Sequence, residues 1–383
     1  MQTIIRGLFF TGLLLFLAPA IQAQIAGLGD LAGGDFSSVA NSVSSDGSVV
    51  VGYSKISSGN EAFRWEAGVM TGLGDLSGGG FASVAYAISG DGSTIVGRGE
   101  SSSGYEGYRW KDGVMTGLGD LPGGRFRSEA FEVSGDGSVV VGSSYGSTDR
   151  QIVYRWTDGI MTELGSLTGS DGFSIATGIS NDGLINVGFS SSSNGVYEAY
   201  RWDDGVMTGL GDLPGGEFFS TANGISDDGT VIVGYSHVSG QNSSGYEAFR
   251  WEDGLMTGLG DLSGGSFFSQ AYDTSEDGSV VVGYSITDVG SEAFVWTETE
   301  GMLSLRNILS AQGSDLSYWQ KLDRALSISA DGNTIVGYGV NQLGDDEGFI
   351  AYINSVPEPN STFFLFIGFV VANLRRDRRK LAI

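Results

Sequence analysis

The 383-residue chain has no cysteine, one histidine, His237, and only five prolines. Without cysteine there is no disulfide, no thiolate metal site and no thiol nucleophile, so stability must come from packing and strand pairing. A single histidine also removes most of the nucleophile–base pairs that covalent catalysis uses. The residues that are missing therefore favour a role other than catalysis.

Basic residues are scarce as well. Residues 24–355 carry 14 Lys and Arg against 43 Asp and Glu, and the whole chain has a formal net charge of −25. A body this acidic repels nucleic acid and anionic lipid, so neither is an expected partner. Glycine is abundant, with 64 residues, and β-branched and aromatic residues are plentiful. That mixture predicts short strands joined by tight turns.

Residues 1–23 have the pattern of a signal peptide. Arg6 supplies the positive charge, residues 7–17 form an apolar core too short to span a bilayer, and small residues follow. Cleavage is expected after Ala20 or after Ala23. An uncleaved membrane anchor is the alternative.

The other end, residues 356–383, combines three features in order. It begins with Val356, Pro357, Glu358 and Pro359, and residues 363–374 form a short apolar segment. Twelve helical residues reach roughly 18 Å, which is short for a stable membrane span. The basic cluster that follows would hold the end of the chain in the cytoplasm. This cluster comprises Arg375, Arg376, Arg378, Arg379 and Lys380.

This arrangement resembles the PEP-CTERM sorting signal of Gram-negative bacteria. The resemblance implies transient anchoring in the inner membrane, cleavage by an exosortase near Pro357 and Pro359, and a final place at the cell surface or outside the cell. It also implies a link to exopolysaccharide or biofilm. Asp377 interrupts the arginines and Asn360 is inserted before Ser361, and a plain tail anchor is the alternative.

Three markers recur through residues 24–355 with one period. The first is an Asp-Gly pair followed by Val-Gly, and the second is a tryptophan, from Trp65 to Trp296. The third is a Gly-Leu-Gly-Asp-Leu block, first seen at residues 27–31. The aspartates of the first marker are Asp46, Asp91, Asp136, Asp182, Asp228, Asp277 and Asp331. Seven copies at steps of about 45 residues indicate a repeat architecture.

Residues 81–121 illustrate one unit. Residues 83–89, 93–96, 105–110 and 114–118 are expected as strands, with a polar loop over residues 97–104. Asp-Gly between alternating runs is a strong hairpin signal. Each unit is therefore expected to be a four-stranded antiparallel meander, which is the size of a propeller blade.

The ends of the array indicate closure. The last unit lacks a fourth strand, whereas an unpaired fourth strand, residues 25–31, precedes the first unit. Pairing the two would remove exposed edges. The sequence therefore predicts an all-β fold, a seven-bladed β-propeller closed by residues 25–31. An open β-array or a β-helix is the alternative.

The repeats also resemble those of the HAF family, extracellular repeats named for a His-Ala-Phe motif. The matching segments are residues 61–65, 198–202 and 247–251, each followed by Met-Thr-x-Leu-Gly-x-Leu. Glutamate replaces the histidine, so no role of that histidine is carried over. The resemblance implies an exported β-rich repeat protein without a defined activity.

One set of repeated acids is a candidate calcium site: Asp30, Asp75, Asp120, Asp212 and Asp261. A Gly-Gly pair follows each, and ring symmetry would place all five on one face, where carboxylates and free carbonyls suit calcium. Ser166 replaces the aspartate in the fourth unit. Loop capping is the alternative reading, and no other cofactor is expected. The Asp-Gly aspartates are interpreted as turn residues.

The tryptophans are expected to pack between blades, with three other aromatics as candidate ligand contacts. Phe219 and Phe268 double a recurring phenylalanine and could line a sugar-binding face, and Trp319 lies out of phase in an insertion, residues 310–324. The inner strands are expected to present residues without acids. These residues are Asn41, Tyr86, Phe131, Thr177, Asn223, Tyr272 and Leu326.

Two functions remain open at this point. The favoured one is a surface binding or matrix protein that engages a polysaccharide or a surface protein. The alternative is a secreted carbohydrate-active enzyme, a glycan hydrolase or lyase, on the same scaffold. Its candidate acids would be Glu129, Glu132 and Asp273, which lie near the expected inner strands.

Overall fold

The computed structural model describes residues 24–168, 172–192, 195–240 and 243–353. The predicted signal peptide, the sorting motif at residues 356–359, the apolar segment and the basic cluster lie outside the described residues. Within the described ranges, no helix is long and apolar enough to cross a membrane.

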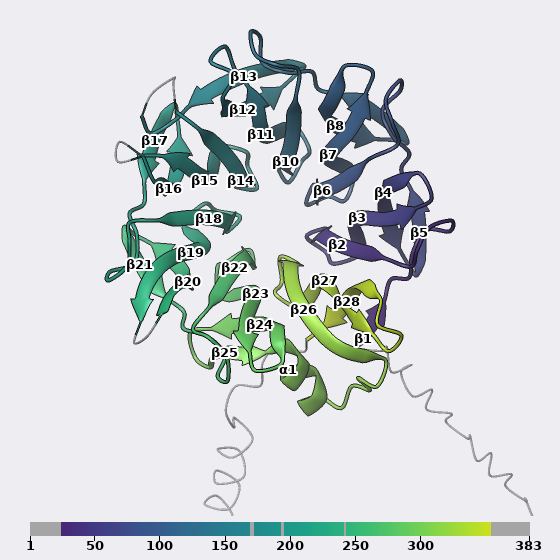
Figure 1. Ribbon diagram of the computed structural model, residues 1–383, viewed down its shortest axis with the longest axis vertical. Helices are drawn as coiled ribbons and strands as arrows, with labels where there is room; N and C mark the ends of the chain where they lie inside the picture. Colours follow the sequence, from purple (N-terminus) through teal and green to yellow (C-terminus); the bar gives the residue numbers. More distant parts are fainter. Residues whose placement is uncertain (1–23, 169–171, 193–194, 241–242, 354–383) are drawn as a thin grey trace, which may run out of the picture.

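Seven four-stranded antiparallel sheets stand around a central axis like the blades of a propeller, as predicted (Figure 1). The innermost strands are β2 (Ser38–Val43), β6 (Val84–Ile88), β10 (Ser128–Val133), β14 (Ser174–Ile179), β18 (Ser220–Ile225), β22 (Ser269–Thr274) and β26 (Trp319–Ile328). The second strands are β3 (Val49–Ile56), β7 (Thr94–Ser101), β11 (Val139–Tyr145), β15 (Ile185–Ser191), β19 (Val231–Gly240), β23 (Val280–Thr287) and β27 (Thr334–Asn341). The third strands are β4 (Gly59–Glu66), β8 (Gly104–Lys111), β12 (Gln151–Thr157), β16 (Tyr197–Asp203), β20 (Ser243–Glu252), β24 (Gly290–Thr297) and β28 (Asp346–Tyr352). The outermost strands are β5 (Val69–Gly72), β9 (Val114–Gly117), β13 (Ile160–Gly165), β17 (Val206–Gly209), β21 (Leu255–Gly258), β25 (Gly301–Ser304) and β1 (Ile25–Gly27).

The ring closes through β1, which confirms the prediction from the ends of the array. β1 pairs antiparallel with β28 and completes blade 7, in the order β1-β28-β27-β26. Ile25 at the start of β1 and Leu28 directly after β1 are both buried. The strand is shorter than the predicted 25–31, because the chain turns at Gly29, whose φ is +74°, into the loop toward blade 1. One helix, α1 (Leu305–Ala311), joins blades 6 and 7.

The first-to-second strand turns all have one construction. In blade 1 the Ser44 hydroxyl donates to Asp46 Oδ1 at 2.7 Å, and the backbone N–H of Ser48 donates to the same oxygen at 2.9 Å. The serine–aspartate bond recurs in the other six blades. These bonds lower the pKa of Asp46. The interpretation of these aspartates as turn residues is confirmed.

The predicted polar loop over residues 97–104 is wrong for most of its length. β7 continues to Ser101 and β8 begins at Gly104, so that only Ser102 and Ser103 connect them. The residues at this end of the hairpin are polar because it projects into water. The two strands pair there through backbone hydrogen bonds and need no apolar side chains.

An antiparallel meander sends alternate connections to opposite faces of the ring. One face, called the turn face here, carries the Asp-Gly turns and the third-to-fourth strand turns. The opposite loop face carries the second-to-third strand hairpins and the Gly-Leu-Gly-Asp-Leu segments. Both described ends lie at the turn face of blade 7. Gln24 accepts the Tyr352 N–H at 2.7 Å, and the Ile353 N–H reaches Asn333 in the Asp-Gly turn.

The largest fully buried side chain of each blade is the aromatic residue two positions before the tryptophan, or its equivalent in blade 7. These residues are Phe63, Tyr108, Tyr154, Tyr200, Phe249, Phe294 and Phe349, all 0% exposed. The repeated tryptophans lie closer to the surface. Trp65, for example, is partly buried at the edge of the core and faces Met70 across the sheet. The repeated tryptophans therefore lie at the margin of the inter-blade core, whereas they were predicted to form it.

The glutamate that stands at the histidine position of the HAF motif has a structural role. Glu61 Oε1 accepts the backbone N–H of Gly74 at 3.2 Å, and Glu106 Oε1 accepts that of Gly119 at 2.8 Å. A Cβ at Gly72 would collide with the Glu61 carboxylate. Blades 4, 5 and 7 repeat this bond. In these five blades the carboxylate thus fixes the start of the inter-blade loop.

Replacing Glu106 with alanine is expected to lower the free energy of unfolding by about 1–2 kcal/mol, because the Gly119 N–H loses its charged acceptor in a partly buried loop. Chemical denaturation measures this change. The control is Glu300→Ala, at an exposed position on the turn face, which should change stability by less than about 0.5 kcal/mol. Equal effects of both substitutions would contradict the capping role.

Candidate functional site

The five aspartates proposed for calcium lie one per blade on the loop face. Asp75 accepts three backbone N–H groups, from Leu76 at 2.7 Å, Ala82 at 2.6 Å and Glu100 at 3.1 Å. That pattern is a loop cap. Among the described residues no group of three or more His, Cys, Asp or Glu side chains is arranged to hold a metal ion. Calcium binding by Asp30, Asp75, Asp120, Asp212 and Asp261 stays a prediction.

Trp319 is not an exposed aromatic, and that expectation is wrong. The residue begins β26 and is 3% exposed, packed in the core of blades 6 and 7 with its ring 6.0 Å from that of Phe349. Residues of α1 and the start of β26 both belong to this core, so the tryptophan fills space inside rather than facing a ligand.

Phe219 and Phe268 do lie on the loop face, partly exposed. Each precedes an inner strand by one residue. They belong to an unbroken series of contacting rings, called the aromatic band here, that crosses blades 4, 5 and 6. The band comprises Phe173, Phe189, Tyr197, Phe219, Tyr235, Tyr246, Phe268 and Tyr284.

Neighbouring ring centroids in the band are 5.3 to 6.3 Å apart, in tilted and edge-to-face pairs. All rings except Tyr284 keep part of their surface in solvent, and Tyr197 is 39% exposed. Such pairs stabilise one another by about 0.5–1.5 kcal/mol beyond their burial. The rings therefore hold their orientation and present a preformed apolar surface.

The band uses three equivalent positions in blades 4 and 5 and the first two of them in blade 6. They are the residue before the inner strand, the residue after Val-Gly in the second strand, and the residue that starts or lies near the start of the third strand. The strand register is the same throughout: Tyr235 pairs with Ala248 in blade 5 as Arg98 pairs with Gly107 in blade 2. The positions are therefore spatially equivalent, and their chemistry differs from blade to blade.

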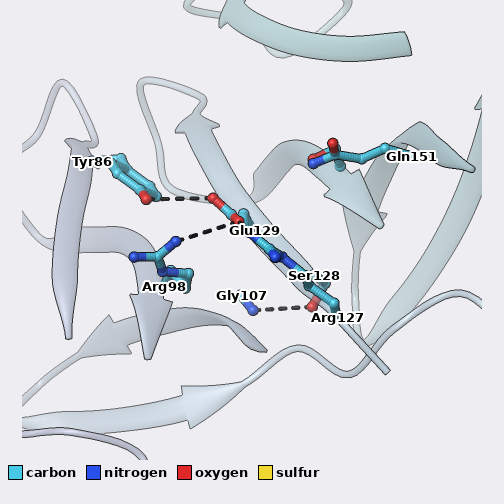
Figure 2. Close-up of polar contacts among 8 residues, drawn as sticks. Tyr86, Arg98, Gly107, Arg127, Ser128, Glu129 and Gln151 are labelled. Atoms are coloured by element: carbon cyan, nitrogen blue, oxygen red, sulfur yellow. Dashed lines mark hydrogen bonds and ion pairs between the residues drawn. The ribbon is translucent and has the colours of Figure 1, made fainter. Parts of the chain in front are cut away.

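In blades 2 and 3 two of these positions hold arginines, Arg98 and Arg127, which form an arginine cluster around Glu129, shown in Figure 2. Glu129, which is 7% exposed, accepts hydrogen bonds from Arg127 at 2.9 Å, Arg98 at 3.5 Å and the Tyr86 hydroxyl at 3.4 Å. Both guanidinium groups also lie over the Tyr105 ring, at 4.6 Å for Arg98 and 5.7 Å for Arg127. Two cations thus share one carboxylate.

The central channel is a second candidate site. A cavity of about 140 Å³ lies in it toward the turn face, lined by residues of the inner strands. Around it, backbone hydrogen bonds of 2.9 to 3.1 Å link each blade to the next and close a ring around the axis. They join Ser45 to Gly90, Asp91 to Gly135, Gly135 to Asn181, Asn181 to Asp227, Asp227 to Glu276, Glu276 to Ala330, and Ala330 to Ser45. Small-molecule sites usually occupy about 300–1,000 Å³, so this cavity suits a few water molecules better than a sugar chain.

Glu132 and Asp273 line this cavity, as does Asp227. Burial, and to a smaller degree the negative charge of Asp273, raise the pKa of Glu132 to about 8. Burial also raises the pKa of Asp273, although its carboxylate accepts bonds from Ser327 and from the Ile328 N–H. Glu129, the third acid considered for catalysis, is instead paired with arginines on the loop face.

Sequence reasoning found Phe219 and Phe268 but missed Arg98, Arg127 and the tyrosines of the band. A signal was present: reading down the residue after Val-Gly gives Tyr53, Arg98, Ser143, Phe189, Tyr235, Tyr284 and Tyr338. Only the strand register shows that this column lies on the loop face.

No family model matches the chain, and no curated protein matches its sequence. Among solved structures, an oligogalacturonate lyase in complex with manganese has a TM-score of 0.52 at 12% identity, over 82% of this chain and 89% of that one. An oligogalacturonate lyase from Vibrio parahaemolyticus has a TM-score of 0.52 at 10% identity, over 90% and 97%. The β-propeller domain of the trilobed protease from Pyrococcus furiosus also has a TM-score of 0.52, at 11% identity over 86% and 99%. At these identities the similarity shows one thing, that the chain has the β-propeller fold.

Proposed function

We propose that the protein is an exported propeller of a Gram-negative bacterium that binds a polysaccharide on its loop face, at the cell surface or in the extracellular matrix. Export is supported by the signal peptide pattern of residues 1–23, and surface sorting by the Pro-Glu-Pro tail of residues 356–383. The association with exopolysaccharide or biofilm comes from the resemblance of that tail to the PEP-CTERM signal.

The aromatic band is the observation that carries the binding proposal. Sugar rings have apolar faces, and partly exposed aromatic rings offer flat apolar surface to stack on them. The band extends over three consecutive blades, which suits an extended polymer more than a single small molecule. A contiguous exposed apolar patch is a common sign of a binding site.

The positions of the two ends are consistent with this role. Gln24 and Ile353 both lie at the turn face of blade 7, so a tether at either end would leave the loop face directed away from the membrane. An exosortase would act near Val356–Pro359.

The test measures binding of the full chain, purified in mild detergent, to a panel of neutral and acidic polysaccharides by calorimetry. Replacing both Phe219 and Phe268 with alanine should weaken binding about tenfold or more, because the band loses two of its stacking surfaces. Leu255→Ala is the matched control, since Leu255 is an apolar side chain of the same blade, 68% exposed at the turn face.

Loss of binding only in the double phenylalanine variant, with its thermal midpoint maintained, would support the proposal. Unchanged affinity in that variant, or no binding to any polymer, would contradict it. The same mixtures test the alternative of a glycan hydrolase or lyase. Shortening of the polymer that disappears in Glu132→Gln or Asp273→Asn would establish catalysis in the channel instead.

A further inference from the structure

On the loop face, equivalent positions carry different kinds of side chain in blades 2 and 3 than in blades 4 to 6. Blades 4 to 6 present the aromatic band, whereas the equivalent positions of blades 2 and 3 present Arg98, Tyr105, Arg127, Ser143 and Gln151. The uncharged residues of blade 3 in this set, Ser143 and Gln151, are polar, and Gln151 Nε2 donates to the Ser143 hydroxyl at 2.7 Å. Blades 2 to 6 form one continuous arc, since they follow one another around the ring (Figure 1).

The arginine cluster retains unused capacity to bind an anion. Each guanidinium has five N–H donors, yet Glu129 takes one long bond from Arg98 and one from Arg127. Within the described residues, the Nε atoms of both arginines are buried and have no hydrogen-bond partner, so the donors open to a ligand are the other N–H groups of each guanidinium. The side chains remain 25% exposed for Arg98 and 38% for Arg127, whereas that of Glu129 is only 9% exposed. The accessible part of the cluster is therefore the cationic part.

The charge of the whole protein makes this cluster unusual. Residues 24–355 hold 14 basic side chains against 43 acidic ones, so a second cation beside a single buried carboxylate is not explained by general surface composition. Arg125 lies two residues before Arg127 in the sequence, and its guanidinium stacks on the Tyr145 ring at 3.9 Å. Asp149 pairs with the same guanidinium. A guanidinium fork matches a carboxylate in geometry as well as in charge.

We propose that the polysaccharide bound by the aromatic band carries carboxylate groups, as a polyuronate does, and that Arg98 and Arg127 bind one of these carboxylates. This inference rests on the proposed function, because it assigns the charge of the ligand for the same face. The sugar rings stack on the band in blades 4 to 6, and the acid group of a neighbouring residue along the polymer pairs with the cluster in blades 2 and 3. The Tyr105 ring holds the two guanidinium groups in place, because both lie over its face.

The experiment compares a polyuronate with the same polymer after chemical reduction of its carboxyl groups, both titrated into the full chain. The polyuronate should bind about tenfold more tightly. The double variant Arg98→Gln/Arg127→Gln should lose this preference while its affinity for the reduced polymer stays unchanged. Arg201→Gln is the matched control, because Arg201 pairs with Asp203 at 2.8 Å on the turn face, and it should alter neither affinity.

A second variant keeps the test decisive if the double arginine variant folds poorly. Glu129→Gln removes the competing carboxylate, frees both guanidinium groups and should raise the affinity for the polyuronate several-fold. A purely structural ion pair would give no such gain. Unchanged or weaker polyuronate binding in Glu129→Gln would overturn the inference.

The remaining outcomes separate the two proposals. Equal binding of both polymers, abolished by Phe219→Ala/Phe268→Ala, would leave the binding function intact and overturn the assignment of a carboxylate ligand. No binding of either polymer would contradict both. Poly-glutamate that binds as tightly as the polyuronate would show recognition of charge alone and would overturn the assignment to a glycan.

Discussion

Deleting residues 25–31 from the full chain is expected to lower the thermal midpoint by about 10 °C or more. The deletion removes the buried side chains of Ile25 and Leu28, each worth about 2–5 kcal/mol by comparison with truncations of buried aliphatic residues. It also leaves β28 as an edge strand with unpaired backbone groups, which favours association between molecules. Differential scanning calorimetry and light scattering measure the two effects.

The contribution of side-chain burial is tested separately by the double variant Ile25→Ala/Leu28→Ala. The matched control is Val69→Ala/Val114→Ala, because these valines also lie on outermost strands but are 63% and 61% exposed. The first variant should be strongly destabilised and the second nearly neutral. A deletion variant that stays monomeric with an unchanged midpoint would show that a three-stranded blade 7 suffices. Cleavage of the signal peptide at either expected site, after Ala20 or after Ala23, would leave β1 intact, because both sites precede it.

The second large effect is a rise in stability as the pH falls from 8 to about 5. Burial raises the pKa of Glu132 to about 8, and burial together with Glu276 and Asp273 raises that of Asp227 to about 6. A carboxyl with a raised pKa binds its proton more tightly in the folded state. Folding therefore gains free energy as the pH falls through that pKa toward the unfolded value near 4.

Below about pH 4 the direction reverses. Hydrogen bonds lower the pKa of six of the turn aspartates, and their stabilisation is lost when these groups become protonated. These residues are Asp46, Asp91, Asp136, Asp228, Asp277 and Asp331. Stability should therefore be greatest near pH 5.

Glu132→Gln isolates the largest of these contributions. At pH 8 the variant should be more stable than the parent protein by on the order of 2–3 kcal/mol, since the partial exposure of Glu132 to solvent screens part of the effect. At pH 5 the difference should be much smaller, because Glu132 is then neutral in the folded state and only the unfolded chain, with its ordinary pKa near 4, still ionises it. Thermal midpoints across pH 5 to 8 check this, with Glu300→Gln at an exposed position as control. Parallel curves for parent and Glu132→Gln would contradict the role of this carboxyl.

Much of the architecture is predictable from local signals. An Asp-Gly turn needs only the residues next to it, as the bonds of Asp46 to Ser44 and Ser48 show, so each hairpin can be read from the sequence. Closure by residues 25–31 followed from counting strands. The capping role of Glu61 and Glu106 was not predicted, because their partners Gly74 and Gly119 lie 13 residues further along the chain.

The sequence by itself determined the repeat, its phase, the number of blades and the closing strand, since each depends on periodicity and short-range turn chemistry. Tertiary structure decided which side chains meet. The inner strands all contain a register shift, as between Ala130 and Glu132, and such a bulge changes which side chains face the axis. Asn41, at the equivalent shift in blade 1, consequently reaches the Ala85 carbonyl of blade 2. The arginine cluster likewise joins Arg98 to Glu129 across 31 residues. Strand register and the packing of blades around a common axis bring such residues together, and neither is encoded in any single repeat.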